Sequence, residues 1–244
     1  FRSYARAALI LVNSPAYVDF LQAQGVPAQK IRFIAYGADC EVFNPRNDGS
    51  QLRQSWGMNG EFVALYAGAM GQANDLHVLL DAAEALRGEP TIRLVLAGDG
   101  KQRPALQAES TRRQLDNVLF TGTYPKAAMP QVLAAADVCL AVLQDIPAFT
   151  MTYPNKVFDG MAAGKATLLA IDGVIRQVLE QAGGGWFVPP GDGLALAQAI
   201  RRAAADREAT RQMGWRAAEY VCLNFNRQQK MAETRALLHE VAGK

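Results

Sequence analysis

Short runs of apolar residues alternate along this chain with longer segments whose apolar positions recur every three or four residues. The short runs, rich in Val, Ile, Leu and Ala, predict strands buried on both faces, and the longer spacing predicts amphipathic helices. The predicted strands are residues 7–12, 30–35, 62–66, 92–97, 118–121, 138–141, 166–170 and 185–188. The clearest predicted helices are residues 76–86, 103–113, 129–135, 156–163, 174–181 and 195–205. This alternation predicts an α/β fold with a doubly wound, mostly parallel, Rossmann-like sheet.

The segment 36–59 differs from its surroundings because it is polar and carries several Gly and Pro residues. Such a composition predicts a linker, so we expect a domain boundary there. Residues 1–36 are then interpreted as the end of a preceding domain plus the connecting segment, and residues 37–244 as one doubly wound domain. The chain from residue 207 onward is helix-prone, and three aromatic residues predict that it docks against another element: Trp215, Tyr220 and Phe225.

Composition narrows the classes of protein to which the chain can belong. Half of its 244 residues are hydrophobic, and the formal net charge of +2 gives no field that would attract nucleic acid. No apolar run reaches the ~20 residues of a membrane helix and no signal-peptide pattern opens the chain, so a cytoplasmic location is predicted. The cysteines, Cys40, Cys139 and Cys222, are far apart and are interpreted as buried thiols in a reducing compartment.

Ligands of open parallel sheets bind beyond the carboxyl ends of the strands, so the loops there carry the candidate chemistry. The loop 68–71 contains Gly68 and Gly71, whose backbone could approach a phosphate at a helix N-terminus, but a simple tight turn explains it equally well. In the loop 98–100, Asp99 lies between two glycines. A role in stabilising the turn is favoured over ligand binding, because Asp bonds its own backbone amides in such turns.

The most informative segment is residues 152–165. Pro154 and Asn155 are predicted to begin a helix, which makes the helix N-terminus a site for an anion, with Lys156 in its first turn. Asp159 lies on the same helix face, and its carboxylate could accept hydrogen bonds from ribose hydroxyls. A surface ion pair between Lys156 and Asp159 explains the spacing equally well.

Other chemistries have little support. His77 and His239 lie in predicted helices without partner residues, which disfavours catalytic triads and zinc sites. The chain has neither an Asp-x-Asp pair nor a Walker-type Gly-Lys-Ser/Thr sequence. The fold could therefore bind a nucleotide without a metal ion.

Together with the sequence Gly-Trp-Phe-Val-Pro-Pro-Gly-Asp at residues 185–192, the segment 152–165 resembles the C-terminal half of family 4 glycosyltransferases of the GT-B fold. Residues 31–43 resemble the interdomain segment of that family, and residues 117–122 resemble its strand and turn beside the nucleotide base. Met213-Gly214 and the helix that follows resemble its tail, which crosses back to the N-terminal domain. The Pro-Asn-Lys-x-Phe-Asp form is most similar to bacterial O-antigen and capsule enzymes, including the N-acetyl-L-fucosamine transferase.

By this resemblance, Asp159 corresponds to the second acid of the family's Glu-x7-Glu motif, which holds the ribose hydroxyls. Met151 stands where the first acid would fall, and Ala69 and Asn74 stand near the usual Arg and Lys. Lys156 is then the candidate catalytic cation. The resemblance implies a donor site made of Gly68, Ala69, Met70, Gly71, Gly98, Asp99, Gly122, Tyr124, Thr152, Pro154, Asn155, Lys156, Val157 and Asp159.

The resemblance implies metal-free transfer, with retention of configuration, from a UDP-sugar, for which an amino sugar is preferred. The acceptor would be a lipid-linked or other glycan in surface polysaccharide synthesis, held by an N-terminal domain that could contact the inner membrane face. The fragment alone would bind donor weakly and be inactive. One rival is a GT-B-like UDP-sugar epimerase, disfavoured by the scarcity of carboxylates and histidines. The other is a catalytically silent nucleotide-binding module, favoured by the missing first acid and cations.

Overall fold

The computed structural model describes residues 2–243, and within them all eight predicted strands are present. Six of the strands form one parallel sheet in the order β5-β4-β3-β6-β7-β8, while β1 and β2 pair separately. The strand order reverses direction between β3 and β6, which makes their carboxyl ends the switch point of a doubly wound sheet. The strands are β1 (Ile10–Val12), β2 (Ile31–Phe33), β3 (Phe62–Ala67), β4 (Ile92–Ala97), β5 (Val118–Gly122), β6 (Val138–Val142), β7 (Ala166–Ala170) and β8 (Gly185–Phe187).

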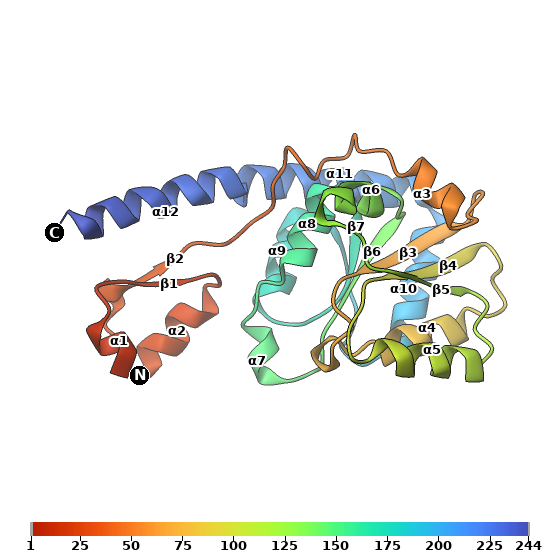
Figure 1. The fold of residues 1–244 in the computed structure, drawn as a ribbon, viewed down its shortest axis with the longest axis horizontal. Helices are drawn as coiled ribbons and strands as arrows, with labels where there is room; N and C mark the ends of the chain where they lie inside the picture. Colours follow the sequence, from red (N-terminus) through yellow and green to blue (C-terminus); the bar gives the residue numbers. More distant parts are fainter. Residues whose placement is uncertain (1, 244) are drawn as a thin grey trace.

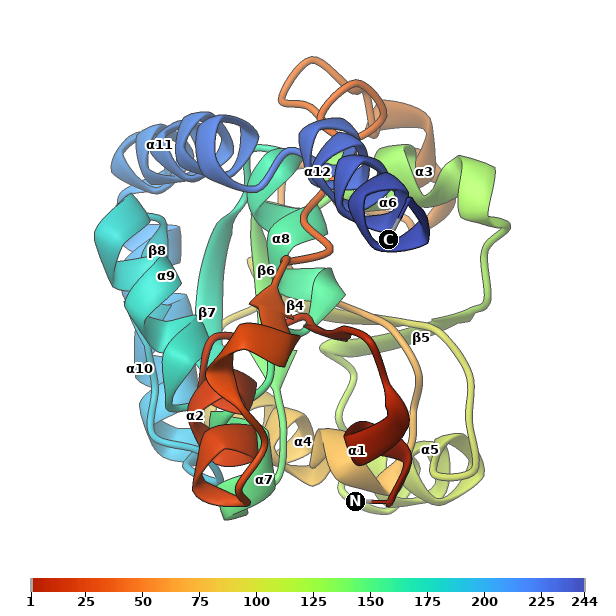
Figure 2. The same ribbon diagram turned by 90° about the vertical axis from the view of Figure 1, so that its left-hand side faces the viewer.

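Helices cover both faces of the six-stranded sheet (Figure 1, Figure 2). The α-helices are α1 (Arg2–Arg6), α2 (Ala16–Ala23), α3 (Ser50–Ser55), α4 (His77–Ala85), α5 (Arg103–Arg112), α6 (Met129–Ala134), α7 (Pro147–Thr150), α8 (Asn155–Ala162), α9 (Val174–Ala182), α10 (Gly193–Ala205), α11 (Arg207–Asn224) and α12 (Arg227–Ala242). Three short 3-10 helices connect them: η1 (Ala28–Lys30), η2 (Gln72–Asn74) and η3 (Lys126–Ala128). Helices α4, α5 and α10 contribute to one hydrophobic core, and α6, α8, α9 and α11 contribute to the other. The predicted doubly wound α/β fold is confirmed.

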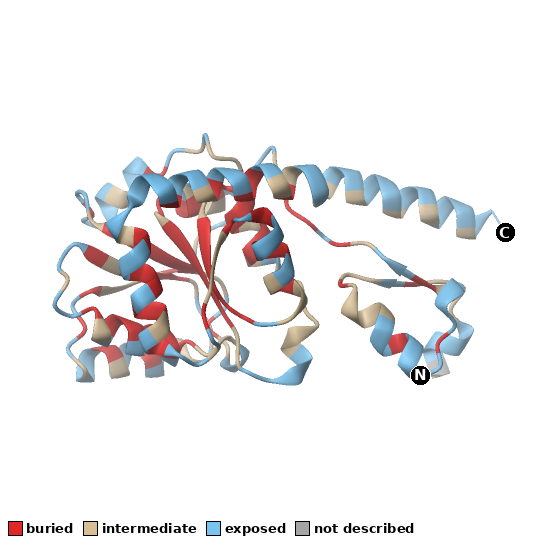
Figure 3. Cartoon of the chain, turned by 180° about the vertical axis from the view of Figure 1, so that it is seen from behind, coloured by how far each residue is buried: buried red, intermediate tan, exposed pale blue. Residues whose placement is uncertain are grey.

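Alternation along the strands supplies both cores. In β3, Phe62, Ala64 and Tyr66 belong to one core, whereas Val63 and Leu65 belong to the other. All five are buried, as Figure 3 shows for the centre of the sheet. Because neither face of such a strand meets water, its sequence reads as a continuous apolar run.

The chain before the linker forms a small separate unit, in which β1 and β2 pair in parallel with Ile10 opposite Ile31. Its own core consists of Ile10, Leu21, Val26 and Ile31. Strand β1 is shorter than predicted, since residues 7–9 have neither helical nor strand structure. The predicted linker 36–59 is not wholly irregular, since it contains α3.

Two chain segments run side by side between this unit and the six-stranded sheet. Ala38 forms a parallel bridge with Asn226, and its amide donates to the carbonyl of Phe225 at 3.0 Å. Gly37 has φ +61°, and a Cβ there would lie 1.9 Å from that carbonyl oxygen, so only glycine fits the crossing. Figure 1 shows α12 continuing from the crossing past β1 and β2.

A disulfide between Cys40 and Cys222 joins the same two segments. The interpretation of all three cysteines as buried thiols is therefore wrong for this pair, and only Cys139 is a buried free thiol. Sequence spacing could not reveal the pair, because 182 residues separate two cysteines that the crossing brings together.

The aromatic residues of the tail behave differently from one another. Tyr220 and Phe225 pack against the core of the α8 face, as expected for docking. Trp215 does not dock, since it is 54% exposed on α11. Helix α12 carries no buried residue among those the structure describes.

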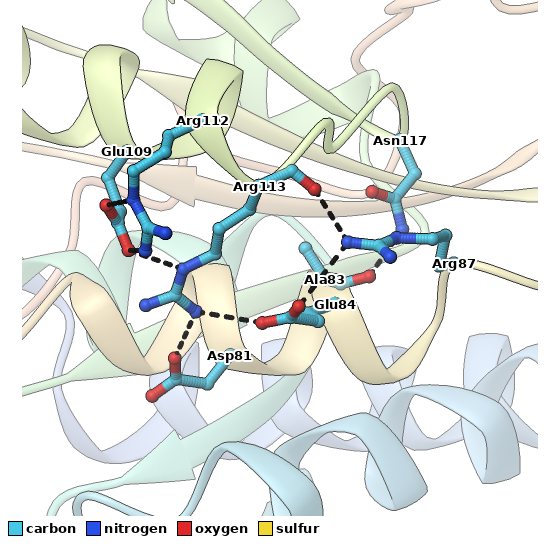
Figure 4. Close-up of polar contacts among 8 residues, drawn as sticks. All are labelled: Asp81, Ala83, Glu84, Arg87, Glu109, Arg112, Arg113 and Asn117. Carbon is cyan, nitrogen blue, oxygen red and sulfur yellow. Dashed lines mark hydrogen bonds and ion pairs between the residues drawn. The ribbon is translucent and has the colours of Figure 1, made fainter.

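An ion-pair network on the outer surface joins α4 to α5 (Figure 4). Arg113 contacts Asp81 and Glu84 on α4 as well as Glu109 on α5, at 2.5, 3.2 and 2.6 Å. Its neighbour Arg112 contacts Glu109 alone. The Arg113 side chain is 18% exposed and that of Arg112 is 70% exposed, so water screens the pair of Arg112 much more.

Replacing Arg113 by Ala should lower the free energy of unfolding by about 1–2 kcal/mol, because the change removes a partly buried cation that contacts Asp81, Glu84 and Glu109 at once. Arg112→Ala is the matched control and should change it by less than about 0.5 kcal/mol. Urea unfolding at low and high salt measures both. Equal losses for the two variants would show that the network does not couple α4 to α5.

Candidate functional site

Three loops meet at the carboxyl edge of the sheet, following β3, β4 and β5. The amide of Gly68 donates to the carbonyl of Ala97 at 2.9 Å, and the amide of Gly98 donates to the carbonyl of Gly122 at 2.7 Å. Gly98 has φ +151°, and a Cβ there would lie 1.9 Å from the Gly68 carbonyl oxygen. Gly98 is therefore required where the loop after β4 packs on the loop after β3.

The predicted loop residues do not all face the same space. Met70 is fully buried, and its amide donates to the carbonyl of Asp99 at 2.7 Å, so it offers nothing to a ligand. Asp99 accepts from the amide of Gly100 at 2.7 Å, as expected for a carboxylate that stabilises its own turn. The amides of Gly68 and Met70 already donate to backbone carbonyls, so the loop amides available to an anion are those of Ala69 and Gly71. Ala69 is exposed, so a ligand can reach it.

The loops enclose a hollow of about 270 Å³. Gly68, Ala69, Gly98, Asp99 and Tyr124 line it together with Ala67, Ala97, Thr123 and Met129. The Tyr124 hydroxyl accepts a hydrogen bond of 2.8 Å from Trp56 Nε1, which fixes the ring against the linker helix α3. Residues that the sequence placed in three separate loops thus line one space.

Lys156 reaches this edge from the first turn of α8. Its Nζ donates to Asn74 Oδ1 at 2.7 Å and to the Tyr66 hydroxyl at 3.1 Å, and it lies 4.5 Å from the centre of the Tyr66 ring. A Cβ at Gly68 would lie only 3.6 Å from the same nitrogen. The ammonium therefore lies beside the glycine loop, between β3 and α8.

No carboxylate within residues 2–243 forms an ion pair with Lys156. The expected alternative, a surface pair between Lys156 and Asp159, does not form. Burial lowers the pKa of Lys156 from 10.5 to about 8 and raises that of the Tyr66 hydroxyl, because water is withdrawn from both groups. A partly buried cation held by neutral oxygens and a ring can still accept an anionic ligand.

Asp159 lies one turn further along α8 and faces a second hollow, of about 150 Å³. Its partner is Arg227 at the start of α12, at 3.4 Å. Burial raises the pKa of Asp159 to about 6, against the opposing attraction of Arg227 and Lys126. The second hollow is lined by Lys156 as well, and it shares Ala67 and Met129 with the loop hollow.

The N-terminus of α8 is as the sequence predicts, with Pro154 before its first residue, Asn155. Two other predicted contacts there are not available to a ligand. The Thr152 hydroxyl donates to the carbonyl of Phe149 at 2.8 Å, and Val157 is buried, with its amide donating to the Pro154 carbonyl at 3.1 Å. The amides of Asn155 and Lys156 keep the free N–H groups typical of a first helical turn.

The family described as "Glycosyl transferases group 1" matches residues 61–206, which is more than half of the chain. This chain belongs to the glycosyl transferases group 1 family. The match covers the six-stranded sheet together with both glycine loops and α8, and it ends before α11 and α12.

Relatives agree with this membership. A putative colanic acid biosynthesis glycosyltransferase of Escherichia coli K12, WcaL, is 26% identical over 244 residues, covering 96% of this chain and 57% of that protein. The crystal structure of Anabaena Alr3699/HepE in complex with UDP-glucose superposes with a TM-score of 0.80 and 26% identity, covering 94% of this chain and 64% of that one. The chain spans about half the length of the curated relatives it matches.

A solved structure also matches the six-stranded part alone. The C-terminal domain of a glycosyl transferase group 1 family protein, LpcC, from Francisella tularensis covers 78% of this chain and 98% of its own length. Its TM-score is 0.65 and its identity 18%, so it shows the shared fold only. The fold is therefore that of GT-B glycosyltransferase structures.

The sequence analysis did not identify three residues that contact Lys156 or Asp159: Tyr66, Asn74 and Arg227. Tyr66 could have been found from the sequence, because its hydroxyl stands at the end of an apolar run and a buried hydroxyl needs a hydrogen-bond partner. Asn74 was noted only as the place of a missing cation, yet its side-chain oxygen holds Lys156. Arg227 gave no signal, since 68 residues separate it from Asp159.

Metal and membrane features add nothing to the site. Across residues 2–243, no group of three His, Cys, Asp or Glu side chains is arranged to hold a metal ion. His77 and His239 lie in α4 and α12 and are exposed. None of the described helices combines the length and apolar character needed to span a membrane.

Lys156→Met should raise the free energy of unfolding at pH 7 by roughly 1–2 kcal/mol, since the pKa of Lys156 shows that folding disfavours its charged form. The folded pKa of about 8 lies below the ordinary 10.5, so the unfolded chain binds more protons between these values. Wild-type stability therefore rises with pH across this window, and its deficit relative to Lys156→Met should disappear above pH 10.5.

The control for Lys156→Met is Lys126→Met, because Lys126 lines the same hollow but is exposed. Chemical denaturation at pH 7, 8.5 and 10 gives the comparison. A stability gain that is equal for both variants, or that does not vary with pH, would contradict a desolvated ammonium at Lys156.

Proposed function

We propose that this edge of the sheet binds the donor of a retaining glycosyltransferase, which transfers a sugar from a UDP-sugar to a glycan acceptor. The observation that carries the proposal is Lys156: a partly buried ammonium with neutral partners, beside a glycine loop and in the first turn of a helix. An anion is the missing partner of such a group, and a diphosphate provides two negative phosphates close together.

In this proposal the diphosphate lies between Lys156, the amides of Asn155 and Lys156, and those of Ala69 and Gly71. Negative charge grows on the diphosphate as its bond to the sugar breaks. The ammonium and the positive end of α8 stabilise that charge without rearrangement, because both are already fixed. No metal ion is needed for this step.

We assign the ribose and the base of the donor to the two hollows. The ribose hydroxyls would donate to Asp159, the acid that faces the smaller hollow. The base would lie in the hollow of Gly98 and Tyr124, whose lining is small and partly apolar. We prefer uridine, and the Anabaena structure with UDP-glucose supports this choice for a chain of the same fold.

We further propose that residues 1–36 end an acceptor-binding domain and that residues 37–244 form the donor domain. The separate core of β1 and β2 supports this division. The name of the E. coli relative supports a role in surface polysaccharide synthesis. An N-acetylamino sugar as the donor sugar, a lipid-linked acceptor and a location at the inner membrane face belong to the same proposal.

One observation favours a catalytically silent nucleotide-binding module. Met151 lies in the turn between α7 and α8, where the family resemblance places the first acid, so no carboxylate stands at that position. Hydrolysis of UDP-sugar by the full-length protein, with analysis of the product anomer, separates the two functions. A retained anomer supports the transferase, and no turnover with intact UDP binding supports the silent module.

UDP should raise the melting temperature of this chain without added magnesium, because Lys156 and helix amides replace the metal. EDTA should leave the shift unchanged, and uridine, which has no phosphate, should give a much smaller one. Thermal-shift assays with UDP, GDP, ADP and CMP provide the comparison. A clear shift with GDP and none with UDP would refute the nucleotide assignment, and loss of the shift in EDTA would refute the metal-free site.

Asp159→Asn should weaken UDP binding by roughly 1.5–3 kcal/mol, about tenfold or more, because it removes a charge-assisted acceptor but keeps the shape. The melting temperature without UDP should not fall, since the raised pKa of Asp159 already disfavours its charge. Calorimetric titration of both proteins measures the difference. Asp172→Asn is the control, because that carboxylate accepts from the amide of the next residue, Gly173, at 2.7 Å and lines neither hollow. Equal UDP affinities for wild type and Asp159→Asn would refute the ribose role.

A further inference from the structure

Arg227 lies in the wall between two cavities. One is the 150 Å³ hollow of Asp159, and the other is a cavity of about 420 Å³ between the β1–β2 unit and α12. Asn13 and Tyr36 line the larger cavity from the β1–β2 side, and Lys230 lines it from α12. Arg227 lines both.

The bonds of Arg227 join three segments that are distant in sequence. Its Nη2 donates to the carbonyl of Gly37 at 2.8 Å and to Asp159 Oδ1 at 3.4 Å, while its amide donates to the Ala38 carbonyl at 2.8 Å. The short bonds anchor Arg227 to the crossing, and the longer one reaches the candidate donor site. The position of the crossing therefore sets the position of the cation beside Asp159.

The charges around Asp159 make this contact important. Arg227 from α12 and Lys126 from η3 favour its ionised form, whereas Asp39 from the crossing and the withdrawal of water oppose it. Lys156 lines the same hollow, but its Nζ is bonded to Tyr66 and Asn74. Arg227 is the cation in hydrogen-bonding contact with the carboxylate among the described residues.

We propose that Arg227 is a positioning residue for donor binding: its contact with Asp159 keeps that carboxylate ionised for the ribose hydroxyls, and its bond to the Gly37 carbonyl makes this contact depend on the interdomain crossing. The inference rests on the proposed donor site. The contact between Arg227 and Asp159 would tighten donor binding when the crossing has the arrangement seen here. Donor binding would weaken when the crossing moves.

The test is a double-mutant cycle with Arg227→Gln and Asp159→Asn, titrated with UDP by calorimetry from pH 5.5 to 8. Without Arg227, the pKa of Asp159 should rise further, so UDP should bind about fivefold more weakly than to wild type at pH 6 and nearly equally at pH 8. Using the ratio of variant to wild type cancels the ionisation of UDP itself. In the Asp159→Asn background, Arg227→Gln should have no further effect.

Two further variants separate positioning from a structural role. Arg227→Lys should restore most of the affinity at pH 6, since it returns a cation to the same place. Lys230→Gln is the control on the same helix, because Lys230 lines only the larger cavity and pairs with Glu233. Tighter UDP binding by Arg227→Gln, a loss that does not vary with pH, or an equal loss in the Asp159→Asn background would each overturn the inference.

A measurement without nucleotide keeps this inference separate from the proposed function. Carbon-13 NMR of the Asp159 carboxyl, assigned by its disappearance in Asp159→Asn, follows its titration in wild type and in Arg227→Gln. A higher midpoint in Arg227→Gln supports the role of Arg227, and an unchanged midpoint refutes it. If wild type binds no UDP at any pH, the donor-site proposal fails, while the NMR titration still decides whether Arg227 controls Asp159.

Discussion

A parallel sheet whose strand order reverses must leave a crevice at one edge, because the chain leaves β3 and β6 toward opposite faces. The rest of this structure depends on that constraint. The loops after β3, β4 and β5 close one side of the crevice by bonding to one another, and the N-terminus of α8 closes the other. Every group we assign to the donor reaches the crevice from one of these elements, except Arg227.

The charged groups of the crevice are held at a cost to stability. Burial shifts the pKa of Lys156 down and that of Asp159 up, so folding disfavours the charge on both. Lys156 has neutral partners, and among residues 2–243 the cation in contact with Asp159 is Arg227, at 3.4 Å. Apolar residues at these positions would give a more stable protein. The neighbouring strands β3 and β6 are apolar and buried in this way. A bound diphosphate nucleotide would supply the missing partners.

The crossing connects this site to the rest of the chain. Gly37 and Ala38 bond to Phe225 and Arg227, and the Cys40–Cys222 disulfide joins the same two segments. An aromatic group continues the connection, since Tyr153 contacts Phe33 of β2 at 6.0 Å and Phe225 at 6.1 Å between ring centres. The segment leading into α8 is thus in contact with the crossing and with the β1–β2 unit at once.

The sequence by itself determined the strands of the sheet, the main helices that cover it and the residue at which α8 begins. These follow from local patterns: strands buried on both faces need unbroken apolar runs, and Pro154 with Asn155 begins α8 within one turn of Lys156. The resemblance seen in the sequence also predicted which residues correspond to the family's site positions, including Asp159 for the second acid and Met151 in place of the first.

Only the tertiary structure decided which groups meet. The spacing of Lys156 and Asp159 in the sequence is compatible with an ion pair between them. In the fold, Lys156 contacts Tyr66 and Asn74, whereas Asp159 contacts Arg227. The fold likewise assigned Met70 and Val157 to the core, left Trp215 exposed and brought Cys40 to Cys222. Periodicity fixes the face of an element on which a side chain lies, but its partner is fixed by packing between elements far apart in the chain, and no local pattern records that packing.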